Sequence, residues 1–201
     1  MFKSGSKRKK REKGFTLIEL LVVAAIIGIL LALAIPNLIK ARISANEANA
    51  RKMMQTLRDA EGEYFEQDLD GEGGRDFTDQ IGDLNTNKSL RCPRATGNCE
   101  EEDALIDSSF EGAEADDPEL SACDSPKAGY CVTNDFADLQ PNAVGGYDDF
   151  GWEASPISVN KTGRKDFAVY GDGVIRCTVP NNPTTGDHGK FTATRNSPGC
   201  D

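Results

Sequence analysis

The feature that most constrains this chain is an apolar run of 19 residues, Leu17 to Ile35, whose only charged residue is Glu19. As a helix rising ~1.5 Å per residue, the run would be about 28 Å long, enough to cross the hydrocarbon core of a bilayer. Residues 1–14 carry seven Lys or Arg and one Glu. Basic flanks stay in the cytoplasm, so the chain after Lys40 is expected on the outer side.

Two other interpretations also fit a basic N-terminus followed by an apolar run. A secretory signal would be cleaved at Ala32-Leu33-Ala34, but the run exceeds the usual apolar region of roughly 7–15 residues. A plain signal anchor would tolerate that length. Neither explains Glu19, because an ionisable side chain inside a bilayer requires a partner. Cleavage after Gly14 would create one, since Phe15 would gain a free α-amino group.

The motif Gly-Phe-Thr-Leu-Ile-Glu-Leu, which begins at Gly14, follows a basic leader and precedes Pro36-Asn37. This pattern resembles the type IV prepilin family, which includes the pseudopilins of type II secretion. The resemblance implies cleavage between Gly14 and Phe15 and N-methylation of Phe15. It also implies that Glu19 pairs with the amino terminus of a neighbouring subunit during filament assembly.

The resemblance also implies partners and a location. The partners are prepilin peptidase, the inner-membrane assembly machinery, and further copies of the chain bound through the N-terminal helix. The chain would lie in the inner membrane as a prepilin and then in an extracellular filament. A pseudopilin, the alternative, would instead form a periplasmic filament.

One long helix is expected from Phe15 to about Phe65. Pro36 removes the hydrogen bond to the Ala32 carbonyl, so a kink or local opening is expected there. The resemblance implies that this region can lose helicity inside a filament, which makes Pro36 a candidate assembly residue. Beyond Lys40, an apolar stripe with 3-4-3-4 spacing predicts packing on a sheet. Its members are Ala50, Met53, Leu57, Ala60 and Tyr64.

Strand signals follow late in the chain. Phe150, Trp152 and Ala154 alternate with other residues, and two apolar runs, 167–170 and 174–179, flank a Gly-Asp-Gly hairpin signal. Residues 81 to about 143 are expected to form acidic loops that contribute few residues to the core. The expected fold is α+β: a long helix, with its hydrophobic half protruding, packed on an antiparallel sheet of three or more strands with disulfide-pinned loops. The expected domains are a cleaved leader (1–14), a transmembrane and assembly helix (15–40) and a pilin-like head (41–201).

Six cysteines lie outside the apolar run, and in an exported domain an even number predicts disulfides. Zinc is a poorer explanation because no Cys-x-x-Cys occurs and His188 is the only histidine. Six cysteines permit fifteen pairings. Local closure is favoured, which pairs Cys92 with Cys99, Cys123 with Cys131, and Cys177 with Cys200.

An acidic, glycine-containing segment follows the long helix and can be aligned with a twelve-residue calcium loop. Calcium prefers six to eight hard oxygen ligands on a sharply turning backbone. A solvated turn that ends the helix is the alternative. The candidate ligands are Asp68, Asp70, Glu72, Asp76 and Asp79.

Charge and motifs bear on other functions. After residue 14 the chain carries 16 of its 23 Lys and Arg and 32 of its 33 Asp and Glu, a net charge of −16. Such an acidic surface argues against binding to nucleic acids or anionic lipids. No Gly-x-Ser-x-Gly or His-Glu-x-x-His motif occurs, so the sequence predicts a structural protein and no enzyme.

Overall fold

The computed structural model describes residues 14–67, 75–84, 104–115, 123–134, 142, 146–179 and 192–200. By its internal contacts the chain divides into two compact units, Met1–Lys40 and Ala41–Asp201. The leader expected for residues 1–14 lies outside the described residues, apart from Gly14.

The long helix expected from Phe15 is present as α1, which runs from Leu17 to Gln67. It continues without interruption through Pro36, so the local opening that was one expectation there is not observed, and the kink stays a prediction. The side-chain amide of Asn37 donates to the Leu33 carbonyl at 3.3 Å, one turn back along the helix. Among the described residues, α1 is the one helix long and apolar enough to cross a membrane.

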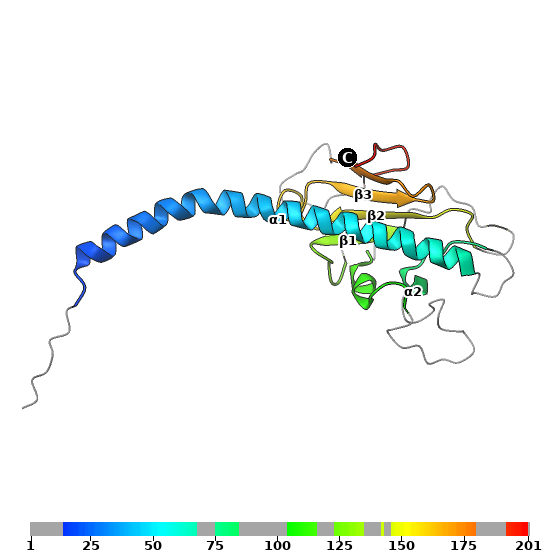
Figure 1. The fold of residues 1–201 in the computed structure, drawn as a ribbon, viewed down its shortest axis with the longest axis horizontal. Coiled ribbons are helices and arrows are strands. Elements are labelled where there is room, and N and C mark those ends of the chain that lie inside the picture. Colours follow the sequence, from blue (N-terminus) through cyan, green and yellow to red (C-terminus); the bar gives the residue numbers. More distant parts are fainter. Residues whose placement is uncertain are drawn as a thin grey trace, which may run out of the picture. The chain divides into compact units, whose positions relative to one another are not determined.

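Four antiparallel strands form a sheet in the order β1-β2-β3-β4 (Figure 1). Their bounds are β1 Tyr130–Asn134, β2 Gly151–Pro156, β3 Asp166–Tyr170 and β4 Ile175–Thr178. The hairpin expected around Gly-Asp-Gly joins β3 to β4, and Gly173 adopts a φ of 73° that favours glycine. The α+β prediction with three or more strands is therefore confirmed.

The expectation that residues 81–143 lack core residues is wrong. This segment contains β1, the short helix α2 (Ile81–Leu84) and the 3-10 helix η2 (Ser108–Ala113). Because these elements are short, they leave no periodic signal in the sequence, and β1 is fixed by its pairing with β2. The buried apolar residues that the segment contributes include Ile81, Leu84, Ile106, Phe110, Tyr130 and Val132.

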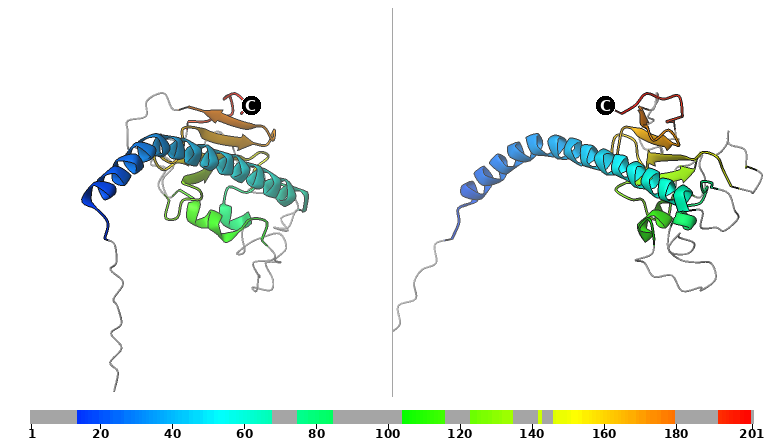
Figure 2. Two further views of the ribbon diagram at one scale, coloured as in Figure 1. Left: turned by 60° about the vertical axis from the view of Figure 1, so that its left-hand side comes forward. Right: turned by 45° about the vertical axis from the view of Figure 1, so that its right-hand side comes forward.

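The part of α1 after residue 40 runs across one face of the sheet (Figures 1 and 2). The expected stripe packs there: Ala50, Met53, Leu57 and Ala60 are buried, and Tyr64 lies against the same core. Trp152 and Val169 from the sheet belong to this core as well. Burying each large apolar side chain stabilises the fold by ~1.5–3 kcal/mol, so this stripe fixes which helical face meets the sheet.

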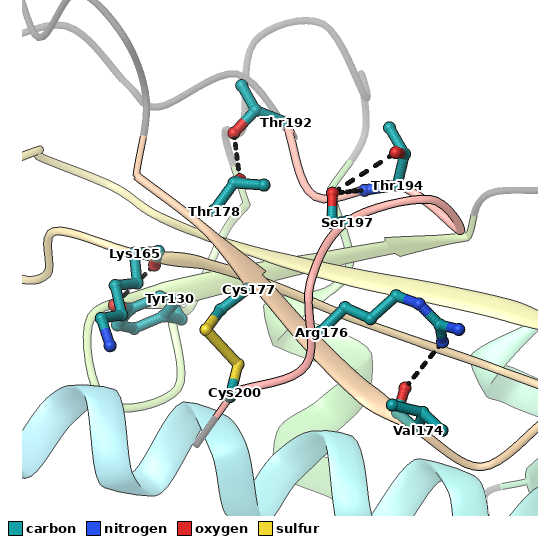
Figure 3. The surroundings of a disulfide bond; sticks show 10 residues. All are labelled: Tyr130, Lys165, Val174, Arg176, Cys177, Thr178, Thr192, Thr194, Ser197 and Cys200. Carbon is teal, nitrogen blue, oxygen red and sulfur yellow. Dashed lines mark hydrogen bonds between the residues drawn. A yellow bond between two sulfur atoms is a disulfide. The ribbon is translucent and has the colours of Figure 1, made fainter.

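Two disulfides occur among the described residues, Cys123–Cys131 and Cys177–Cys200, and both match the local pairs favoured above. Cys92 and Cys99 lie outside the described residues. The second bridge holds the C-terminal segment against β4 (Figure 3). Cys177 donates its backbone N–H to the Pro198 carbonyl (3.1 Å), and Cys200 donates to the Ile175 carbonyl (3.0 Å). The segment therefore covers the outer side of β4, which is the strand at one edge of the sheet.

Candidate assembly site at the start of helix α1

The proposed cleavage position lies in a short non-helical segment before α1. Gly14, Phe15 and Thr16 precede the first helical residue, and the Phe15 side chain is 85% exposed. A Cβ added to Gly14 would have no neighbouring atom within 4 Å. Packing among the described residues therefore does not require a glycine at this position.

Glu19 and Thr16 form a capping box at the start of α1. The Glu19 carboxylate accepts hydrogen bonds from the backbone N–H of Thr16 (2.8 Å) and from its hydroxyl (2.7 Å). In return, the Thr16 hydroxyl accepts from the backbone N–H of Glu19 at 3.3 Å. These reciprocal bonds satisfy amide groups that lack a partner in the first helical turn.

The sequence analysis did not identify this cap, although its signal was present. A Thr three residues before a Glu, ahead of an apolar run, is the pattern of a capping box. The arrangement has a chemical consequence, because it holds a carboxylate at the positive end of the helix dipole. It also places that carboxylate against Thr16, the residue directly after the proposed new amino terminus at Phe15.

Along the rest of the first unit, α1 exposes a continuous series of large apolar side chains. Leu20 is 66% exposed and Leu33 68% exposed. Exposed apolar surfaces of this extent mark a site of contact with a membrane or another protein. Those at least 60% exposed between residues 17 and 40 are Leu17, Ile18, Leu20, Leu21, Ile29, Leu30, Leu33 and Leu38.

Comparison with known proteins agrees with this geometry. Residues 9–35 match the family model described as the prokaryotic N-terminal methylation motif. The chain is also similar to the type IV major pilin protein PilA of Myxococcus xanthus, with 37% identity over 98 residues. Both findings support the resemblance to the type IV prepilin family. A second relative is the type IV wide pilus major component PilA4 of Thermus thermophilus, with 63% identity over 38 residues.

The similarity of this chain to its relatives covers part of each protein. The Myxococcus match spans 47% of this chain and 43% of the relative, and the match to PilA4 spans 19% and 29%. A third match, to the Thermus type IV narrow pilus major component PilA5, has 48% identity and spans 25% and 43%. This chain thus spans less than half the length of these relatives. No solved structure matches it.

A buried carboxylate in the head was also missed from the sequence. Glu61 of α1 is fully buried, accepting from the indole Nε1 of Trp152 at 2.7 Å and from the backbone N–H of Thr78 at 3.3 Å. Burial raises the pKa of Glu61 to about 8, although these two hydrogen bonds oppose the shift. The available sequence signal for its burial was the position of Glu61, which lies four residues after Leu57 on the stripe that faces the sheet.

Two of the five expected calcium ligands, Asp76 and Asp79, lie within the described residues. Asp68, Asp70 and Glu72 lie outside the described residues. Asp76 is buried beneath Gly146, where an added Cβ would collide with its carboxylate, and Asp79 accepts from the Tyr147 hydroxyl at 3.4 Å. Within the described part of the chain, no three His, Cys, Asp or Glu side chains form a metal-binding group. The calcium site stays a prediction.

Proposed function

We propose that this chain is a structural subunit of a type IV pilus-like filament. Prepilin peptidase cleaves between Gly14 and Phe15, and the new amino terminus at Phe15 is N-methylated. The processed chain stays in the inner membrane until the assembly machinery extracts it. It then polymerises through α1 and has no catalytic role.

The observation that carries this proposal is the position of Glu19. Its carboxylate lies in an otherwise uncharged apolar stretch, three residues from the cap residue Thr16. Among the described residues, both hydrogen bonds to this carboxylate come from Thr16, a neutral residue, and no ion pair joins it. The ammonium group of Phe15 in a neighbouring copy would neutralise that charge.

The exposed apolar surface of α1 supplies the driving force for the proposed assembly. In the monomer, lipid tails cover this surface between residues 17 and 39. In a filament, the same side chains would pack against their copies in neighbouring subunits. Dispersion contacts and the pairing of Glu19 with an amine then replace the contacts with lipid. Pro36 is proposed to help this packing because it lacks one helical hydrogen bond and so permits local adjustment.

The pseudopilin of a type II secretion system is the alternative. The pilus is favoured because the relatives described above are named as components of type IV pili. Pilus subunits would reach the cell exterior in long fibres, whereas a pseudopilin would remain in the periplasm.

Electron microscopy of sheared surface material, combined with mass spectrometry of the chain, tests the proposal. We expect extracellular fibres that contain this chain with an N-methylated Phe15 as its first residue. Fibres confined to the periplasm would favour the pseudopilin. An intact Met1, or a start at Ile35, in the native protein would contradict both forms of the proposal.

A further inference from the structure

A hydrogen-bonded turn of the head packs against α1 at Asn46 and Glu47. The turn, residues 158–163, is closed by bonds from the Asn160 N–H to the Gly163 carbonyl (2.8 Å) and from the Thr162 N–H to the Ser158 carbonyl (2.9 Å). Gly163 approaches the Tyr130 ring so closely that an added Cβ would collide with the hydroxyl. The turn therefore holds the residues around it in fixed positions.

Two hydrogen bonds attach this region to the helix. The side-chain amide of Asn46 donates to the Thr162 carbonyl at 2.8 Å, and the Glu47 carboxylate accepts from the backbone N–H of Arg164 at 2.9 Å. Arg42 lies four residues before Asn46 and so on the same side of α1. Residues more than 110 positions apart in the sequence thus meet at one end of the head.

This end of the head is basic, and we call its four cations the basic collar: Arg42, Lys161, Arg164 and Lys165. The first three are exposed and Lys165 is half-buried. Among the described residues, none of the four side chains forms an ion pair. Glu47, the acid beside them, uses a carboxylate oxygen for a backbone N–H. The collar keeps a net positive charge on a head that is acidic overall.

Along the chain, Arg42 of the collar closely follows the last residue of the exposed apolar surface. Ile39 is the last residue of that surface, and Asn46 follows it by seven residues, a rise of ~10 Å along a helix. The headgroup region extends roughly 6 Å beyond the hydrocarbon core on each side. Asn46 would therefore lie a few ångströms above the headgroups, within the Debye length of ~8 Å at physiological salt.

We propose that the basic collar binds the anionic phospholipid surface of the leaflet from which α1 emerges. The collar cations would contact lipid phosphates while the chain is held in the membrane as a monomer, and would leave them on extraction. This inference rests on the membrane-held monomer of the proposed function. It adds a specific lipid class and a defined surface that orients the head.

An acidic patch on a second copy is the competing partner for these cations. The membrane is favoured because the collar lies within about seven helical residues of the apolar surface, so every membrane-held chain places it near headgroups. Contact with a second copy would first require two heads to meet in the correct orientation. Attraction of Lys and Arg to anionic headgroups requires no such step.

Electron spin resonance of spin-labelled lipids tests the proposal with the full chain in vesicles of phosphatidylcholine and phosphatidylglycerol. The quantity measured is the ratio of association of labelled phosphatidylglycerol to that of labelled phosphatidylcholine. We expect this ratio to be lower in the Lys161→Gln/Arg164→Gln variant by at least about twofold. The difference between variant and unaltered chain should shrink when the salt is raised, because surface charges are screened.

The matched control is Lys52→Gln/Arg75→Gln, which removes the same charge from exposed positions outside the collar. It should keep the ratio of the unaltered chain. The basic leader is identical in all these chains, so its own attraction to lipid cancels in the comparison. Fluorescence of Trp152 reports whether each variant folds. A second pair of variants, Arg42→Gln in the collar and Lys52→Gln as its control, repeats the comparison with one charge removed.

The proposal would be overturned if the ratio were unchanged in the collar variant, or if it fell equally in the control. If the collar variant kept its lipid ratio but lost chemical cross-links between copies, the collar would instead be assigned to contact with a second copy. Vesicles contain no assembly machinery, so this measurement does not depend on filament formation. If cells form filaments but the collar variant keeps the lipid ratio in vesicles, only the collar proposal is refuted. If cells form no filaments, the proposed function is refuted.

Discussion

The carboxylate of Glu61 accepts a hydrogen bond from the indole of Trp152 at 2.7 Å, and both side chains are fully buried. This contact joins α1 to β2, and the second carboxylate oxygen joins the helix to Thr78. The head therefore contains an ionisable group at the junction of its helix and its sheet. Because burial disfavours the charged form, the pKa of Glu61 is raised to about 8.

The stability of the head should fall as the pH rises towards 8. Between the ordinary Glu value of 4.5 and about 8, the folded chain holds a proton that the unfolded chain has released. Unfolding is then favoured by rising pH, by an amount on the order of a few kcal/mol over the whole window. Urea unfolding of the full chain in detergent, followed by the fluorescence of its single tryptophan, measures this slope.

Glu61→Gln should remove most of that slope between pH 6.5 and 8, because glutamine does not titrate. Glu66→Gln at an exposed position is the control and should leave the slope unchanged. The lower limit of 6.5 reduces the contribution of Asp166, whose pKa burial raises to about 6. An unaltered slope in Glu61→Gln would show that another group titrates.

Glu19→Ala should give a processed, membrane-bound monomer that does not join filaments. The substitution removes both the charge that the amine of Phe15 would meet and the acceptor of the bonds from Thr16. We expect at least a tenfold loss of sheared fibres, with cleavage retained. Glu19→Gln separates the two roles, because an amide oxygen can still cap the helix but carries no charge. Normal fibres from either variant would refute the pairing.

Gly14→Asp should block cleavage, so the chain keeps its leader and its mass does not shift on electrophoresis. An added Cβ at Gly14 has no neighbour within 4 Å among the described residues, so the larger side chain meets none of them. A loss of processing would therefore report recognition by the peptidase and no misfolding. Gly62→Ala, at another glycine with open space around it, should be processed normally. A cleaved Gly14→Asp chain would argue against this processing site.

Removal of the Cys177–Cys200 disulfide by paired serine substitutions should destabilise the head by ~3 kcal/mol. The bridge closes a loop with a sequence separation of 23 residues, and its loss returns loop entropy to the unfolded chain. It should also increase hydrogen exchange at the Cys200 amide, which donates to the Ile175 carbonyl. The matched variant without Cys123–Cys131, a separation of 8, should lose slightly less stability and keep that amide protected.

Several elements could be predicted because their signals are local. The apolar run, the Gly-Phe-Thr-Leu-Ile-Glu motif and the Gly-Asp-Gly hairpin each depend on residues close together in the chain. Strand β1 could not be predicted this way, since it is short and its partner β2 begins 17 residues after it ends. The hydrogen bond between Glu61 and Trp152 could not be predicted either, because the two residues lie 91 positions apart in the sequence.

The sequence by itself determined that this chain has a membrane-length helix with one acid near its start, because hydrophobicity, helical period and charge are properties of neighbouring residues. Only the tertiary structure decided which polar groups share an environment. It buried Glu61 against Trp152, and it placed Lys161 and Arg164 beside the helix turn that follows Arg42. Net charge sums over the whole chain, whereas burial and local potential depend on which distant segments fold against one another.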